Sequence, residues 1–99
     1  MFAGCLNKDS GGEGARDLIQ IEGGADLANK KLHVLQLDVT KEAQWEEAIK
    51  YITKHSPHQN GGLWGLVNNA GWATFGEIEW VPMDTYRKIS EVNFFQFGR

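Results

Sequence analysis

The chain has 99 residues, 41% of them hydrophobic and 23% charged, and a formal net charge of -3. This length and composition are ordinary for one small globular domain. The acidic balance argues against a nucleic-acid face, which needs clustered Lys and Arg, and no apolar run approaches the length of a membrane span. A single cysteine excludes an internal disulfide.

The first part of the chain predicts a strand followed by a helix. Met1–Leu6 is a short apolar run typical of a buried strand, and Asn7–Gly14 is a loop rich in turn-forming residues. We expect a helix over Glu13–Glu22 that ends at Gly23-Gly24. Its apolar residues at helical spacing are Ala15, Leu18 and Ile19, with a further one at Ile21.

A second strand and a second helix are predicted over the middle of the chain. In KLHVLQLDVT (residues 31–40) apolar residues alternate onto both faces, which predicts a strand covered on both sides, as in a parallel sheet. The two sets are Leu32 and Val34 on one face, and Leu35, Leu37 and Val39 on the other. Thr40 is the expected N-cap of the following helix, whose apolar stripe is Trp45, Ala48, Ile49 and Ile52.

The last part predicts a third strand and a third helix. Ser56–Gly62 is a loop, Gly62–Val67 is the strand, and Trp72–Pro82 is a connection. Asp84 is expected to cap the final helix, with Tyr86, Ile89 and Asn93 on one side.

Strands and helices alternate, which is typical of an α/β fold with a parallel sheet. Ligands of such sheets bind beyond the carboxyl ends of the strands. Asp38 and Asn68 both stand at such ends.

Two polar segments at strand ends are the candidate site. The carboxylate of Asp38 either accepts a hydrogen bond from an adenine amino group or serves a turn before the helix, and the residues leave both open. In NNAG (residues 68–71), Ala70 and Gly71 are small enough for a flat ligand to approach the backbone, while Asn68 and Asn69 can tie a strand end to its neighbours. An ordinary Asn-Gly turn is the alternative, although a turn needs only one such residue.

Other motifs favour structural interpretations. GGEGARD (residues 11–17) matches two glycines of G-x-G-x-x-G but has Asp17 at the third, so a surface loop is favoured. Tyr51 and Lys54 are adjacent on a helix, but Lys54 is in the last turn, so a surface role is favoured over proton transfer. The histidines at 33, 55 and 58 lack the partners of a metal site, and Cys5 is interpreted as a small packed hydrophobe.

Together LDVT, GLWGLVNNAG and EVNFF, in this order and spacing, resemble the short-chain dehydrogenase/reductase family over nearly the whole chain, up to about Phe95. The resemblance implies a partial doubly wound Rossmann parallel sheet in which the three predicted strands are strands 2–4. Residues 1–99 would then be a fragment of a single NAD(P)-binding Rossmann domain.

The resemblance also implies roles for individual residues. Asn68 would tie the central strands together, and Asn69–Gly71 would form a wall beside the ribose. Asp38 would contact adenine, with the Val39 backbone beside it. Asn93 would be the active-site asparagine, whose helix distorts so that its carbonyl holds a water of the proton relay. No metal is implied.

Three parts of the family pattern have no match in these residues. They are strand 1 with its T-G-x-x-x-G-x-G loop, the downstream Ser and Tyr-x-x-x-Lys, and the glycine-containing continuation that QFGR replaces. Because strand 1 lies between strands 2 and 4 in the doubly wound order, we expect unpaired strand edges and marginal stability in the isolated chain.

The implied activity is hydride transfer between nicotinamide and a secondary alcohol, with 3-hydroxybutyrate and acetoacetate as the expected pair. The resemblance implies NAD as the cofactor, with NADP the open alternative. Cys5-Leu6 stands where NAD-preferring members often carry an acid that binds the ribose hydroxyls, Asp9 follows a few residues on, and Lys8 would favour a phosphate. A retinol or 17β-hydroxysteroid dehydrogenase is the alternative enzyme, and a non-catalytic truncated isoform that pairs with a full-length relative is an alternative of another class. A homo-oligomer through the last helix is possible. The compartment would be mitochondrial for a hydroxybutyrate enzyme and the endoplasmic reticulum for a retinol or steroid enzyme.

Overall fold

The computed structural model describes residues 1–21, 32–56 and 62–98, and the chain separates into two compact units, Met1–Gly62 and Leu63–Arg99. The first unit holds β1 (Phe2–Cys5), α1 (Glu13–Ile21), β2 (His33–Gln36) and α2 (Glu42–His55), and the second holds α3 (Met83–Asn93) and the 3-10 helix η1 (Phe95–Gly98). None of the described helices is long and apolar enough to cross a membrane. The predicted helix end at Gly23-Gly24 lies outside the described residues.

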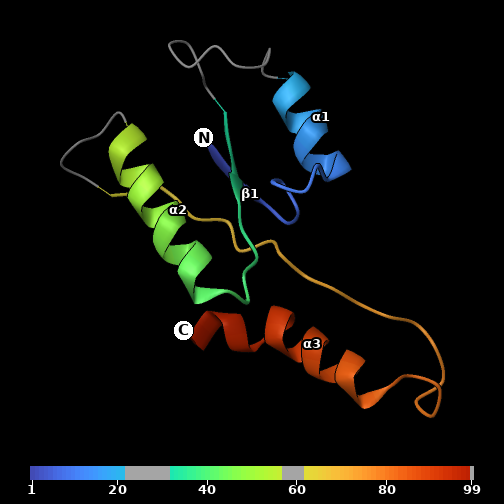
Figure 1. The fold of residues 1–99 in the computed structure, drawn as a ribbon. Helices are drawn as coiled ribbons and strands as arrows, with labels where there is room; N and C mark the ends of the chain where they lie inside the picture. Colours follow the sequence, from blue (N-terminus) through green and yellow to red (C-terminus); the bar gives the residue numbers. More distant parts are fainter. Residues whose placement is uncertain (22–31, 57–61, 99) are drawn as a thin grey trace. The chain divides into compact units, whose positions relative to one another are not determined.

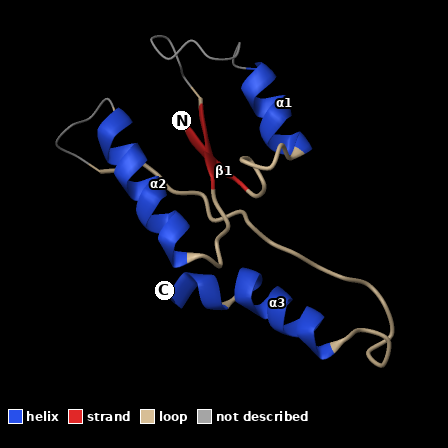
Figure 2. Ribbon diagram, viewed as in Figure 1, coloured by secondary structure: helices blue, strands red, loops and turns tan. Residues whose placement is uncertain are grey.

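In the first unit, β1 and β2 form a two-stranded parallel sheet with α1 and α2 on opposite sides of it (Figures 1 and 2). Phe2 pairs with His33 and Cys5 with Gln36. Ala15 of α1 packs with Leu32 and Val34, whereas His33 contacts Tyr51 of α2. Alternate residues of β2 therefore face different helices, as predicted for a strand covered on both sides. The strand is shorter than predicted, because it ends at Gln36 and leaves Leu37 and Val39 outside it.

The side chain of Leu37, the first residue after β2, lies close against Gly4. A Cβ atom at Gly4 would lie 2.6 Å from Cδ2 and 3.0 Å from Cβ of Leu37. Any larger residue would force Leu37 to move.

The start of α2 differs from the prediction. Its N-cap is Lys41, and no side chain caps it by a hydrogen bond. The Thr40 hydroxyl instead donates to Oδ1 of Asp38 at 2.6 Å. The helix begins one residue later than expected, and the Thr40 side chain belongs to the turn that precedes it. The predicted apolar stripe also holds only in part, since Ala48 is buried but Ile49 is 59% exposed.

The predicted third strand, Gly62–Val67, is not formed. These residues have no strand assignment, and Leu66 and Val67 are 64% and 86% exposed. An apolar segment becomes a strand only when a neighbour satisfies its backbone N–H and C=O groups. In the doubly wound order that neighbour is strand 1, and among the described residues no strand pairs with residues 62–67.

In the second unit, α3 begins after Pro82 rather than at Asp84. Pro82 is the N-cap, with φ -61° and ψ 145°, and Asp84 lies in the first turn. There it pairs with Arg87 across one turn, at 3.1 Å. A carboxylate in the first turn interacts favourably with the helix dipole without capping the helix.

Candidate functional site

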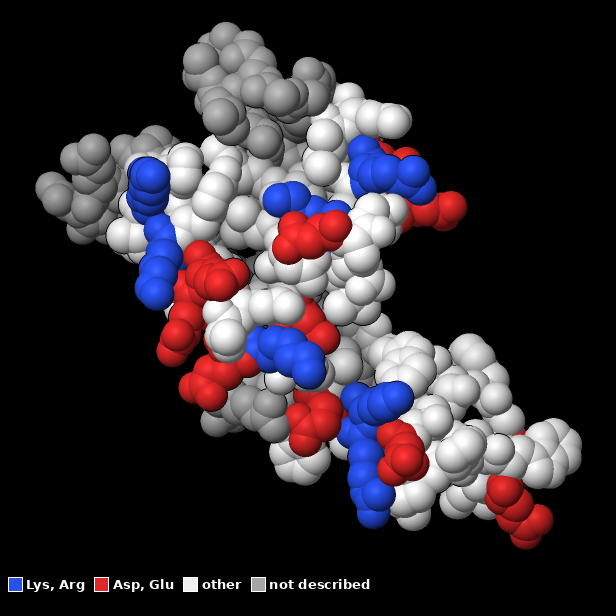
Figure 3. Space-filling view, in the orientation of Figure 1, with Lys and Arg blue, Asp and Glu red and all other residues white. Residues whose placement is uncertain are grey.

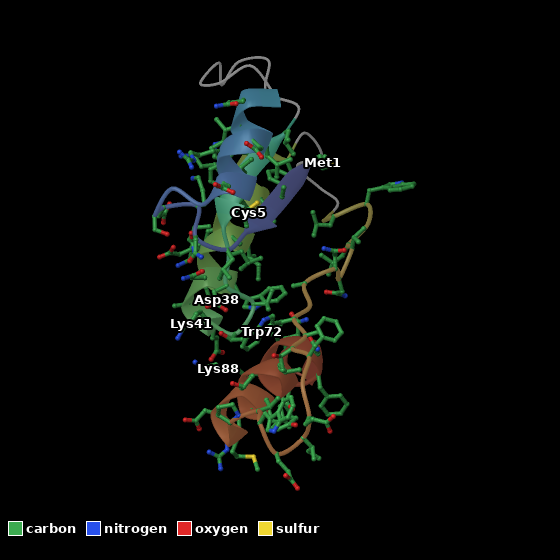
Figure 4. The ribbon with its side chains drawn as sticks, turned by 90° about the vertical axis from the view of Figure 1, so that its right-hand side faces the viewer. Met1, Cys5, Asp38, Lys41, Trp72 and Lys88 are labelled. Atoms are coloured by element: carbon green, nitrogen blue, oxygen red, sulfur yellow. The ribbon has the colours of Figure 1, made fainter. Side chains whose placement is uncertain are left out.

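In the first unit, Asp38 lies between β2 and α2 (Figure 4). Its Oδ1 accepts hydrogen bonds from the backbone N–H of Thr40 at 2.9 Å and from the Thr40 hydroxyl. Its carbonyl accepts from the N–H of Lys41 at 2.9 Å. Asp38 therefore forms the pre-helix turn that the sequence analysis considered, with one carboxylate oxygen used by the turn.

The turn is also held from α2. The Trp45 indole donates to the carbonyl of Val39 at 2.9 Å. The N–H of Asp38 donates to Oε1 of Gln44 at 2.6 Å. Both bonds come from the first turns of α2, so the helix sets the position of the turn.

In the second unit, Asn68, Asn69, Ala70 and Gly71 lie in a stretch that is neither helix nor strand, and all four residues are exposed. The Gln96 side-chain amide donates to the carbonyl of Ala70 at 3.4 Å, and Gln96 is only 7% exposed. Sequence analysis missed Gln96 and treated it as part of a departure from the family pattern. A polar residue within FFQF is the signal that could have found it.

Asn93 binds the residue that follows this stretch. Its Oδ1 accepts from the N–H of Trp72 at 2.8 Å, and its Nδ2 donates to the carbonyl of Trp72 at 2.7 Å. A Cβ at Gly71 would lie 3.6 Å from Oδ1 of Asn93, an ordinary contact. One amide thus occupies both backbone groups of Trp72, as a neighbouring strand would.

The helix is interrupted at the same point. α3 ends at Asn93, Phe94 has φ -127° and ψ -59°, and η1 begins at Phe95. The N–H of Phe94 still donates to the carbonyl of Ser90 at 2.9 Å. Backbone carbonyls at a helix end lack the α-helical partner that interior carbonyls have.

The predicted site residues therefore fall into two sets. Asp38 and Val39 belong to one compact unit, and Asn68–Gly71 and Asn93 belong to the other. Within the second unit, Asn93 and Gln96 bring α3 and η1 to the end of the NNAG stretch. In the same unit, the small exposed residues at 70 and 71 leave the backbone open to a flat ligand.

The remaining candidates have structural roles. The Tyr51 hydroxyl lies 3.0 Å from Nδ1 of His33, so it is not simply a surface group, while Lys54 is exposed. Among the described residues no group of three or more His, Cys, Asp or Glu could hold a metal ion. Cys5 packs against the core, and burial raises the pKa of its thiol.

Charge is dispersed on the face shown in Figure 3, where the basic and acidic side chains of the described residues are interspersed over the helices. This distribution gives that face no continuous basic patch of the kind a nucleic acid needs.

Comparison with known proteins identifies the family. The family model for short chain dehydrogenases matches residues 11–97. The chain belongs to the short-chain dehydrogenase family. Members of this family typically use NAD(P), and the α/β arrangement described above is a part of their domain.

Relatives within the family include enzymes for two kinds of substrate. The chain is 41% identical over 93 residues to the mitochondrial D-beta-hydroxybutyrate dehydrogenase of Rattus norvegicus, covering 94% of this chain and 25% of the relative. It is 41% identical over 98 residues to estradiol 17-beta-dehydrogenase 2 of Mus musculus, covering 96% of this chain and 23% of the relative. It is also 41% identical over 68 residues to 11-beta-hydroxysteroid dehydrogenase type 2 of Bos taurus, covering 68% of this chain and 16% of the relative.

The chain thus spans about a quarter or less of the length of these relatives. No solved structure matches it significantly.

Proposed function

We propose that this chain forms the cofactor-side wall of an NAD-dependent oxidoreductase that interconverts a secondary alcohol and a ketone, with 3-hydroxybutyrate and acetoacetate as the pair. The observation that supports this most is the double hydrogen bond between Asn93 and Trp72. It holds the end of the NNAG stretch against the interrupted end of α3, so that two elements of the family pattern meet. The hydroxybutyrate relative, which aligns over 94% of this chain, favours the substrate.

In this proposal each set of residues has one task. Asn68 ties strands together, and Asn69, Ala70 and Gly71 present a low wall to the ribose. Asp38 accepts a hydrogen bond from the adenine amino group through its second carboxylate oxygen, and the Val39 backbone lies beside the base. The carbonyl of Asn93, at the helix interruption, holds a water that carries the proton away from the reacting hydroxyl. When bound, the nicotinamide supplies or accepts the hydride.

Several parts of the proposal are inferred from membership of the family. Residues 1–99 are one portion of a single dinucleotide-binding domain. NAD follows from the resemblance to the hydroxybutyrate relative, with Asp9 in the loop after β1 as the residue that would meet ribose hydroxyls, and NADP is the alternative through Lys8. α3 is available for subunit contacts in a homo-oligomer. A mitochondrial location goes with the hydroxybutyrate activity.

A steroid substrate is the second candidate. The estradiol relative supports it, because it aligns over 96% of this chain. Retinol is the related third substrate, and either would go with the endoplasmic reticulum. A hydroxy acid needs a cation for its carboxylate, whereas a steroid or retinol needs a long apolar cavity.

The test begins with the endogenous protein, captured by an antibody to α2 and measured by intact mass spectrometry. The purified protein is then assayed with NAD and NADP against D-3-hydroxybutyrate, its L-isomer, estradiol and retinol. Reduction of NAD with D-3-hydroxybutyrate that is lost in Asn93→Leu supports the proposal. Turnover of estradiol without turnover of D-3-hydroxybutyrate would overturn the proposed substrate.

A captured species of 11.1 kDa, the mass of this chain, that lacks activity and co-purifies with a larger family member would overturn the catalytic proposal. The chain would then be a non-catalytic isoform that pairs with that relative.

A further inference from the structure

A hydrogen-bonded series of side-chain amides, called here the amide series, runs through the first unit from the loop after β1 to the start of α2. The N–H of Asp9 donates to Oε1 of Gln36 at 3.1 Å. Nε2 of Gln36 donates to Oε1 of Gln44 at 3.3 Å. The same Gln44 oxygen accepts the N–H of Asp38 at 2.6 Å. Two glutamines therefore connect the backbone of Asp9 to the backbone of Asp38.

The two ends of the amide series, Asp9 and Asp38, lie at one edge of the sheet. β1 and β2 are parallel, with Cys5 opposite Gln36, and the N–H of Leu37 donates to the carbonyl of Cys5 at 2.9 Å. Asp9 follows the carboxyl end of β1, and Asp38 follows that of β2. This is the edge beyond which parallel sheets bind their ligands.

The loop that holds Asp9 is closed by its own backbone bonds. The N–H of Gly12 donates to the carbonyl of Asn7 at 2.8 Å, and Asn7 and Gly11 have φ of 60° and 79°. A Cβ at Gly12 would lie 3.0 Å from the Asn7 carbonyl oxygen. This loop therefore has a defined shape, and Gln36 connects its middle to β2.

The hydrogen bonds of the amide series all have a fixed donor and a fixed acceptor. Because Oε1 of Gln36 accepts from Asp9, its Nε2 is left to donate to Gln44. Gln44 must then present an oxygen, and an oxygen can accept from both Gln36 and Asp38. Reversing either amide would leave a backbone N–H facing an NH₂ group, so the two loops are held in one mutual arrangement.

We propose that Gln36 and Gln44 are positioning residues that set the spacing of the two loops for the adenosine half of the dinucleotide. The inference rests on the proposed function, since Asp9 and Asp38 meet ribose and adenine there. Neither glutamine touches the ligand. They hold the backbones of the residues that do.

The test uses the natural-length protein that carries this chain, and ADP-ribose as the probe, because it contains the adenosine half without nicotinamide. Isothermal titration calorimetry gives the Kd for the wild type, Gln36→Leu, Gln44→Leu and the double variant. Each single change removes hydrogen bonds, so we expect the Kd to rise by roughly threefold to tenfold. The Kd of the double variant should rise by less than the product of the two single fold-changes, because both glutamines act through the same amide series.

Three further variants separate positioning from general destabilisation. Gln44→Glu retains an acceptor for both donors and should restore most of the affinity. Gln36→Glu still accepts from Asp9 but cannot donate to Gln44, so amide hydrogen exchange should accelerate at Asp38 and not at Asp9. Gln20→Leu, the same change at an exposed position of α1, is the matched control and should leave the Kd unchanged.

The outcomes are distinguishable. Wild-type protein that does not bind ADP-ribose overturns the proposed function and this inference with it. If the wild type binds and Gln44→Leu binds equally well, the inference fails while the proposed function stands. A loss in Gln44→Leu that Gln44→Glu does not restore, accompanied by a lower Tm in both, indicates a general structural role and also overturns it.

Discussion

Asn93 and Trp72 form a two-point pair in which a single side-chain amide accepts from one backbone group and donates to the other, at 2.8 and 2.7 Å. The pair joins two residues that are 21 positions apart. It gives the end of the NNAG stretch the backbone partner that a neighbouring strand would otherwise provide. A role for Asn93 in holding this stretch therefore accompanies its proposed role in proton transfer.

Two substitutions at Asn93 remove either both of its hydrogen bonds to Trp72 or only the one that it donates. Asn93→Leu removes both, so hydrogen exchange at the Trp72 amide should accelerate by roughly threefold to tenfold, since a net hydrogen bond contributes about 0.5–1.5 kcal/mol. Asn93→Asp keeps the acceptor for the Trp72 N–H and should accelerate exchange less. Lys88→Ala, at an exposed position of α3, is the control. Equal exchange in all three variants would contradict the importance of the pair.

Gly4 should not tolerate a methyl group. Gly4→Ala places a Cβ 2.6 Å from Leu37, and overpacking of this kind costs about 1–3 kcal/mol. Urea denaturation followed by circular dichroism measures the loss of unfolding free energy.

Gly14→Ala is the matched comparison for Gly4→Ala, because nothing lies within 4 Å of a Cβ at this helical position. That change should stabilise the protein by about 0.5–1 kcal/mol. Adding Leu37→Ala to the Gly4→Ala variant should restore part of the unfolding free energy that Gly4→Ala loses. A Gly4→Ala variant as stable as the wild type would show that the chain after β2 shifts at little cost.

The hydroxyl of Tyr51 should contribute to the packing of α2 on the sheet. Tyr51→Phe removes the hydroxyl that lies 3.0 Å from Nδ1 of the buried His33. A net hydrogen bond contributes about 0.5–1.5 kcal/mol, so the Tm should fall. Tyr86→Phe removes an exposed 3.4 Å bond to the carbonyl of Ile78 and should change the Tm much less. Equal Tm values for the two variants would argue against the His33 contact.

Cys5 should make the stability depend on pH in the alkaline range. Burial raises the pKa of the folded thiol above its ordinary value of 9.0. The unfolded chain then loses the thiol proton at a lower pH than the folded chain does. This contribution to stability is therefore fully present below pH 9 and is lost as the pH rises through the folded pKa. In urea titrations at pH 7 and 10, Cys5→Ala should lose less stability between the two pH values than the wild type. Identical losses would contradict burial as the cause of the shift.

Much of the local structure follows from the residues alone. The apolar runs at β1 and β2 and the helical spacing in α1 and α2 predicted elements that the structure contains, because side-chain periodicity directly expresses burial. The family was also predicted from LDVT, NNAG and EVNFF, and the family match confirms it. The assignments of cofactor-binding residues and of Asn93 as active-site asparagine remain predictions.

Tertiary contacts decided the rest. Residues 62–67 have the composition of a strand, yet strand formation depends on a hydrogen-bonding neighbour, which composition does not encode. Thr40 has the chemistry of an N-cap, but in the structure its side chain bonds to Asp38 in the preceding turn, and α2 starts after Lys41. The hydrogen-bond partners of Gln36, Gln44, Asn93 and Gln96 could not be predicted, because a hydrogen bond between distant residues depends on where the fold brings them. The sequence by itself determined the periodic elements and the family motifs, and the tertiary structure alone decided which polar groups meet.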